Sequence, residues 1–77
     1  MTDIQSPLPG IFYHKPAPEE PPFKVAGDSV AVGDTIGLME IMKTFIPVTA
    51  EAAGIFQGYA VDDASPVTAG AVLASLG

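Results

Sequence analysis

The sequence predicts a small all-β domain made of two similar halves. Glycine, alone or as a Gly-Asp pair, recurs every several residues between short runs rich in Val, Ile and Phe, a pattern typical of short strands joined by tight turns. No stretch keeps an apolar period of about 3.6 residues bounded by helix caps. A chain of 77 residues suffices for one thin core, so we expect residues 1–77 to fold as a single domain.

A repeated pair of sequence blocks indicates the two halves. PGIF at 9–12 matches AGIF at 53–56, and VAVGDTIGLM at 30–39 matches VTAGAVLASL at 67–76, in the same order. With roughly four short strands per half, both apolar faces are buried most economically between two packed sheets. We therefore predict a flattened barrel or sandwich of two small antiparallel sheets.

The first half is lengthened by the segment HKPAPEEPP at 14–22. The two matched blocks lie seven residues further apart in the first half than in the second, and the surplus falls on this segment. A polar, proline-rich stretch forms neither a helix nor a central strand. We predict an ordered, protruding loop that is an insertion, so that its deletion should leave the fold intact.

Glycines and prolines mark turns and sheet edges in both halves. Gly33 and Gly70 occupy equivalent places, where glycine supplies the positive φ of a tight turn. Pro66 suits a turn or a sheet edge, and Pro47 removes a donor from its strand. We expect Pro66 at a turn or a sheet edge and Pro47 at an edge or a bulge.

Two strand-like runs, IGLMEI and TFIPVTA, flank Met42 and Lys43, which predicts a hairpin with a two-residue turn. Such turns need positive φ and usually contain Asn-Gly or Asp-Gly, so Met-Lys is a poor choice. A local rule broken in this way is typical of functional or strained positions. Glu40 aligns with Gly77, so a two-fold relation between the halves places Lys43 at the pole far from the chain ends.

Apolar side chains surround this lysine, whereas a tip that only aids solubility would be polar on several sides. They offer a surface that a partner protein can grip, and a flexible amine on a stiff tip is a handle for covalent attachment. The residues are Met39, Ile41, Met42, Phe45 and Ile46.

Composition excludes several classes of function. There is no cysteine, which excludes disulfides and thiolate metal sites, and His14 cannot form a metal site alone. The formal charge is −6, with only Lys15, Lys24 and Lys43 positive, so a nucleic-acid partner is not expected. No apolar run is long enough to span a bilayer and the N-terminus lacks signal-peptide features, so we expect no membrane association and a cytoplasmic protein.

EIMK at 40–43 resembles the EAMKM biotinylation motif, and the chain from Ser6 onward is similar to the biotinyl domain of the biotin carboxyl carrier subunit of acetyl-CoA carboxylase. The matching pieces are SPLPGIFY with PAP after it, VAVGDT, EIMK and AGIF. The resemblance implies a flattened β-barrel of two quasi-symmetric four-stranded sheets. It implies biotin joined through an amide to Lys43 by a biotin protein ligase that reads Glu40 and Met42.

The resemblance also implies a non-catalytic carrier, expected to be monomeric. Its biotin would move a carboxyl group from a biotin carboxylase to a carboxyltransferase that acts on an acyl-CoA, with acetyl-CoA and fatty-acid synthesis as the expected setting. The family carriers have a thumb at the position of the insertion, and the FYxxPxP pattern opens it here. Thumb contacts to biotin are then expected from Tyr13, His14, Lys15 and Pro16. The motif's alanine is Ile41 here, and its second methionine is Thr44.

Two other functions stay open. A lipoyl carrier shares the fold and the hairpin lysine, but such carriers typically place an acidic residue where this chain has Met42. An unmodified β-barrel that serves as a binding or adaptor module is the other alternative, favoured by Thr44. An independent enzyme is disfavoured, because the carboxylates of the chain have no convergent partner motif and Asp62-Asp63 suit a solvated turn.

Overall fold

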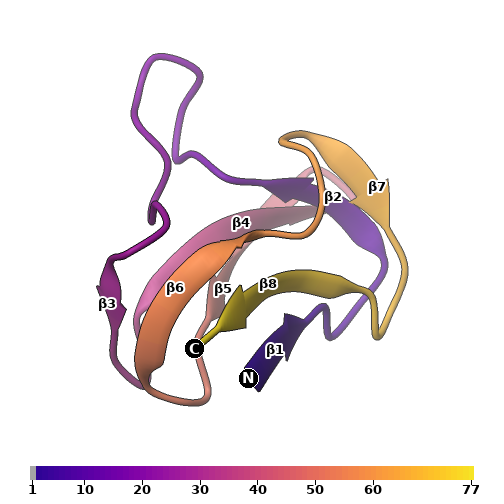
Figure 1. Ribbon diagram of the computed structural model, residues 1–77. Helices are drawn as coiled ribbons and strands as arrows, with labels where there is room; N and C mark the ends of the chain where they lie inside the picture. Colours follow the sequence, from indigo (N-terminus) through magenta and orange to yellow (C-terminus); the bar gives the residue numbers. More distant parts are fainter. Residues whose placement is uncertain (1) are drawn as a thin grey trace.

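The computed structural model describes residues 2–77, which form eight strands (Figure 1). The strands are β1 (Thr2–Gln5), β2 (Gly10–Tyr13), β3 (Ser29–Val30), β4 (Thr35–Ile41), β5 (Thr44–Thr49), β6 (Gly54–Tyr59), β7 (Ser65–Val67) and β8 (Val72–Leu76). They build two four-stranded sheets whose strand pairs are all antiparallel. The predicted all-β class and two-sheet architecture are confirmed. Within residues 2–77 no helix is long and apolar enough to cross a membrane.

The two sheets are related by the internal repeat. Their strand orders are β1-β8-β6-β3 and β5-β4-β2-β7, so each strand of one sheet has its counterpart, four strands away in sequence order, at the same place in the other. Each sheet therefore combines strands from both halves of the chain. Neither half can bury its apolar face alone, because its strands are completed by those of the other half.

The repeat extends further towards the N-terminus than the matched blocks suggest. Ala50 exchanges backbone hydrogen bonds with the turn at Gly33, whose N–H lies 2.8 Å from the Ala50 oxygen. Ser6, which precedes Ala50 by the same 44 residues that separate the PGIF and AGIF blocks, makes the equivalent bond with Gly70 at 2.7 Å. Strand β1 is thus the counterpart of β5, a relation that short sequence identity did not reveal.

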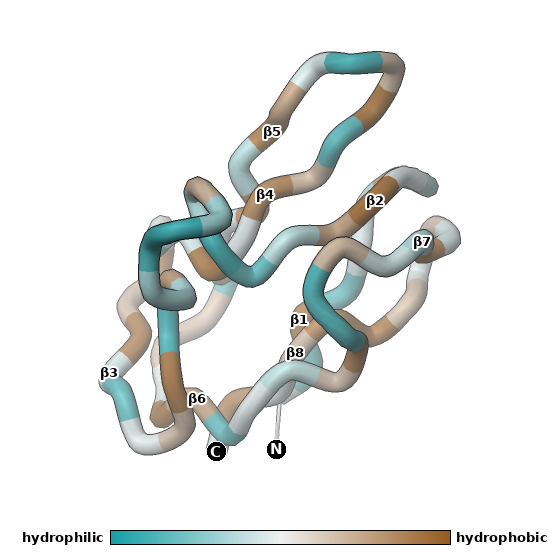
Figure 2. The backbone as a smooth tube through the Cα atoms, turned by 90° about the horizontal axis from the view of Figure 1, so that it is seen from above, coloured by the Kyte–Doolittle hydropathy of each residue, from teal (hydrophilic) through white to brown (hydrophobic). Residues whose placement is uncertain are grey.

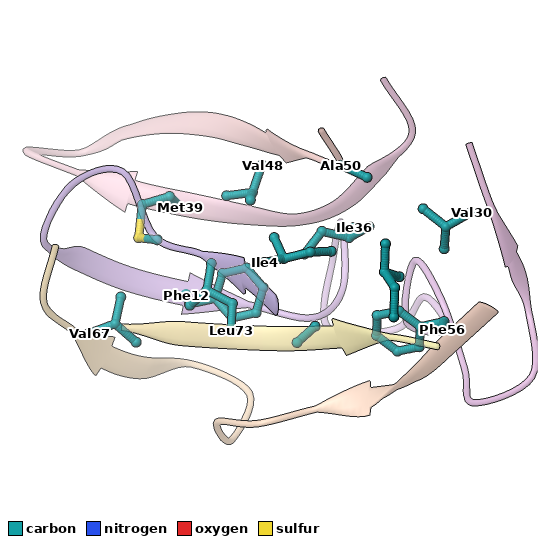
Figure 3. Close-up of a cluster of buried hydrophobic side chains, with 12 residues drawn as sticks. Ile4, Phe12, Val30, Ile36, Met39, Val48, Ala50, Phe56, Val67 and Leu73 are labelled. Carbon is teal, nitrogen blue, oxygen red and sulfur yellow. The ribbon is translucent and has the colours of Figure 1, made fainter. Parts of the chain in front are cut away.

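The core lies between the sheets and repeats this symmetry (Figure 3). Its two phenylalanines, Phe12 and Phe56, are both fully buried and hold equivalent places in β2 and β6. Alternation along the strands turns one face inward, so equivalent positions carry apolar residues in both halves. The other equivalent buried pairs are Ile4 with Val48, Val30 with Val67, Ile36 with Leu73, and Met39 with Leu76.

The predicted turn and edge residues lie where expected. Gly33 and Gly70 have φ values of 92° and 86°, in the left-handed region that glycine adopts without steric cost. Pro47 lies in β5 and Pro66 in β7, and both strands are sheet edges, where a missing N–H donor breaks no ladder. These predictions are confirmed.

The proline-rich insertion is a loop that projects from the body between β2 and β3 (Figure 1), and we call residues 14–22 the thumb. At its base the Phe23 N–H donates to the His14 carbonyl oxygen at 2.9 Å, which brings its two ends together. None of the buried core side chains belongs to it. The thumb is therefore an addition to the framework, as its sequence predicts.

Candidate cofactor-attachment site

The turn that joins β4 to β5 consists of Met42 and Lys43. Both residues have positive φ, 51° and 66°, which defines a type I′ turn, and Ile41 and Thr44 form the last strand pair before it. A non-glycine residue in this conformation costs about 1–2 kcal/mol. The long β4–β5 ladder, with six paired positions, holds the turn in this shape. The predicted hairpin and its unfavourable turn are confirmed.

Lys43 lies at the outermost point of the hairpin. Figure 2 shows the β4–β5 hairpin extending on the opposite side of the molecule from the N- and C-termini, as the repeat predicts. The side chains of Met42 and Lys43 are exposed, and within residues 2–77 the Lys43 amine has neither a hydrogen bond nor a carboxylate within 4 Å. The fold thus presents one primary amine at a fixed pole, accessible to a modifying enzyme.

Glu40 links this hairpin to the neighbouring strand. Its carboxylate oxygen Oε1 accepts a hydrogen bond from the Tyr13 phenol at 2.8 Å, and the Tyr13 ring lies 5.8 Å from the ring of Phe45. Phe45 is the cross-strand partner of Glu40. The bond to Glu40, with partial desolvation and the negative charges of Glu40 and Asp63, raises the pKa of the Tyr13 phenol, because each of them favours the protonated hydroxyl. These contacts brace the base of the turn.

The inward face of the turn explains how Ile41 is accommodated. Ile41 is half-buried and packs against the core, and its Cγ1 lies 3.0 Å from the place where a Cβ on Gly10 would be. Because Gly10 has no side chain, the larger residue fits between β4 and β2. Ile41 is therefore not displayed with the lysine, whereas Thr44 is exposed.

A cavity of about 350 Å³ lies between the thumb and the lysine hairpin. The thumb contributes one wall, strands β4 and β5 contribute another, and the loop between β6 and β7 closes the third side. The lining residues are Tyr13, Lys15, Pro16, Ala17, Pro18, Leu38, Phe45, Asp63 and Ala64. Its edge at Phe45 is only two residues from Lys43 along the chain. We call it the thumb cavity.

His14 lies outside the thumb cavity and anchors the thumb. Its ring stacks on Tyr59 with a centroid distance of 3.7 Å and an interplanar angle of 9°, and its Nε2 lies 2.8 Å from the Val61 carbonyl oxygen. The His14 backbone N–H donates to Asp63 Oδ1 at 2.7 Å. Of the four residues expected to contact biotin from the thumb, Tyr13, Lys15 and Pro16 line the cavity, and His14 fixes the loop to the body.

Sequence reasoning placed Phe45 beside the lysine and Pro18 in the thumb, but it did not bring Leu38, Phe45 and Asp63 together with the thumb in one cavity. Leu38 and Phe45 lie on the outward face of the hairpin with Glu40, so strand alternation from Glu40 identifies them in retrospect. Asp63 reaches the cavity through the fold of a distant loop and has no local sequence signal.

Comparison with known proteins identifies the family. Residues 2–76 match the biotin/lipoyl family profile, described as biotin-requiring enzyme. The chain belongs to this family. Its fold also resembles a part of the urea carboxylase of Kluyveromyces lactis, with a TM-score of 0.77 and 27% identity over 97% of this chain and 6% of that one. The fold class and the cofactor expected from the sequence, biotin, are both supported by these findings.

Related proteins of this family are named carriers. The chain is 37% identical over 65 residues to the biotin carboxyl carrier protein of acetyl-CoA carboxylase 2, chloroplastic, of Arabidopsis thaliana, which covers 84% of this chain and 26% of that protein. It is 36% identical over 64 residues to the biotin carboxyl carrier protein of acetyl-CoA carboxylase of Haemophilus influenzae. This alignment covers 83% of this chain and 41% of that protein. The chain therefore spans about a quarter to two fifths of the length of these relatives.

The residues around the hairpin fit a biotinyl group. The thumb cavity is within the size range of small-molecule sites, which begins at about 300 Å³. Leucine, phenylalanine and proline side chains on its walls suit a saturated ring and an alkyl chain, and the Lys15 ammonium is a donor for a ureido oxygen. The Tyr13 hydroxyl donates its proton to Glu40, so its oxygen is left to accept a ureido N–H. The exposed Lys43 amine supplies the point of attachment.

Proposed function

We propose that this domain is a biotin carboxyl carrier with its biotin in amide linkage to Lys43. The observation that carries the proposal is the turn itself, in which two non-glycine residues with positive φ hold an exposed amine at the pole of the barrel. A strained turn of this kind is retained when the position of its side chain matters. A solubilising lysine would not need it.

The attachment reaction sets the role of the domain as a substrate of a biotin protein ligase. The Lys43 nitrogen must attack the acyl carbon of an adenylated biotin, so that a C–N bond forms, AMP leaves and the amine loses its proton. The proton that the amine loses needs an acceptor, and no such group contacts Lys43 within residues 2–77, so the ligase must supply the base. Glu40 and Met42 are the ligase-reading residues in this proposal, with Met42 93% exposed and Glu40 held by Tyr13.

The carrier's own contribution to carboxyl transfer is positional. Biotin supplies a ureido nitrogen that accepts and releases a carboxyl group, and the partners are a biotin carboxylase and a carboxyltransferase that acts on an acyl-CoA, acetyl-CoA by analogy with the named relatives. A tethered group reaches successive sites at high effective concentration. The rigid barrel fixes where the tether starts, and the thumb cavity offers the head group a resting place, with contacts from Tyr13, Lys15 and Pro16.

The proposal also covers the oligomeric state of the domain, its location in the cell and the pathway in which it acts. We retain a monomeric domain in the cytoplasm and the fatty-acid synthesis pathway as the expected setting. The barrel of residues 2–77 carries its own core between its two sheets, as a domain that must leave one partner for the next requires.

Labelling of the lysine tests the proposal. The chain is co-expressed with a biotin protein ligase and analysed by intact mass and a streptavidin blot, with Lys43→Arg as the test variant and Lys24→Arg as the matched control. We expect one biotinyl group on the wild type and on the control, and none on Lys43→Arg. A wild type that stays unlabelled would favour the adaptor alternative, and a lipoyl mass on the chain from cells would favour the lipoyl carrier.

A further inference from the structure

The charge at the hairpin pole changes when the carrier is loaded. The chain has three lysines and a formal charge of −6. In the proposed function Lys43 becomes an amide and loses its charge. Lys24 is engaged elsewhere, because its amine lies 3.4 Å from Asp34 and 3.2 Å from the Ser29 carbonyl oxygen. Lys15 is then the remaining cation near the attachment point.

Lys15 is placed to act on a bound group. It is half-buried, lines the thumb cavity, and has no carboxylate within 4 Å of its amine among residues 2–77. The other charged residue on the cavity wall, Asp63, already accepts the His14 backbone N–H at 2.7 Å. The cavity therefore combines a lysine that makes no hydrogen bond within residues 2–77 with the apolar residues Leu38 and Phe45.

We propose that Lys15 makes the thumb cavity selective for the charge state of the head group, holding carboxylated biotin more tightly than uncarboxylated biotin. This proposal rests on the proposed function. The uncarboxylated ureido ring is neutral and gains only the apolar contacts and one hydrogen bond. The carboxylated ring carries an anion that the acidic body repels and the Lys15 ammonium attracts, and charge-assisted hydrogen bonds are the stronger kind.

The expected selectivity is small, and this suits a carrier. A solvent-accessible ion pair changes a population by about fivefold at most. Such a preference keeps the loaded group against the body between partners and still allows a partner's active site to withdraw it. Because the pair is accessible to solvent, salt should weaken it.

Amide NMR of the biotinylated domain tests this selectivity directly. Spectra of ¹⁵N-labelled chain, with biotin on Lys43 verified by intact mass, are compared before and after carboxylation by a biotin carboxylase with ATP and bicarbonate. The probes are the amides of Ala17 and Ala64, which line the cavity from the thumb and from the loop between β6 and β7. For each probe we measure the chemical-shift difference from the unmodified chain. We expect this difference to be larger after carboxylation, corresponding to a docked population about threefold to fivefold higher. At high salt the difference should decrease towards the value of the uncarboxylated form.

Three variants separate the charge of Lys15 from its bulk. Lys15→Gln should abolish the extra shift, Lys15→Arg should keep it, and Lys24→Gln should behave as the wild type. Equal shifts in the two biotin forms, or an extra shift that survives in Lys15→Gln, would overturn the role of Lys15 while leaving the carrier function in place. Absence of biotin on Lys43 in the mass spectrum would instead overturn the proposed function, and this inference with it.

Discussion

Gly10→Ala should both destabilise the domain and disturb the lysine hairpin. A Cβ at this position would lie 2.7 Å from the Glu40 carbonyl oxygen and 3.0 Å from both Ile41 Cγ1 and Met39 Sδ. The side-chain atoms can move, but the carbonyl belongs to the β4 backbone inside the β4–β5 ladder. Overpacking of this kind destabilises a protein by about 1–3 kcal/mol. Alanine also lowers the conformational entropy of the unfolded chain relative to glycine, which stabilises the folded state by about 0.4–1 kcal/mol.

These ranges leave a net loss of at most about 2.6 kcal/mol for Gly10→Ala. Because the closest contact is to backbone, we expect a loss of about 1–2 kcal/mol, which lowers the Tm of a domain of this size by roughly 4–16 °C. The repeat provides a matched control in Gly54→Ala. There the new Cβ would approach the equivalent oxygen, that of Gly77, at 2.9 Å rather than 2.7 Å, and its next neighbour, Leu76 Cβ, at 3.1 Å, so the overlap is smaller. We expect its Tm to fall by less than half as much.

The assays are thermal unfolding followed by circular dichroism and the initial rate of ligase labelling at a temperature where both variants are folded. Gly10→Ala should label more slowly than wild type, because the displaced carbonyl is three residues from Lys43, and Gly54→Ala should label at the normal rate. The reasoning is refuted if Gly10→Ala unfolds within about 2 °C of wild type, a shift well below that of a 1 kcal/mol change. Equal losses in the two variants would refute it as well.

Two further predictions concern the thumb and the acid stability. Replacing residues 15–22 by Gly-Gly should leave the far-UV circular dichroism spectrum and the Tm nearly unchanged. The reason is that the hydrogen bond from the Phe23 N–H to the His14 carbonyl oxygen is the one that closes a two-residue turn. Loss of folding would show that the thumb is part of the framework. Asp34 has a lowered pKa, because it accepts the Ala31 N–H at 2.9 Å and lies beside Lys24. Its contribution to stability is therefore complete above the unfolded pKa of about 3.9 and is lost as the pH falls through the lower folded value. Urea unfolding from pH 7 to 2.5 should show wild type more stable than Asp34→Asn at neutral pH, with the difference shrinking in acid; a constant difference would contradict this assignment.

Local patterns in the sequence determined the outline of the molecule. Alternating apolar runs and glycine punctuation depend on neighbouring residues alone, so they predicted the strands and the turns at Gly33 and Gly70. The repeat predicted the symmetry, the position of the thumb and the pole at which Lys43 lies. Met42-Lys43 was identified as unusual because turn preferences are local, and its positive φ values agree.

Tertiary structure decided which side chains surround the lysine. Leu38, Phe45 and Asp63 meet Lys15 in one cavity although they are far from it in the sequence, and His14 is turned away from the cavity by its stack on Tyr59. These contacts depend on strand register and packing between segments 20 to 50 residues apart, for which no local preference exists. The sequence by itself thus determined that an amine is presented on a strained turn. Only the packing of the thumb against the hairpin decided which residues can contact what that amine carries.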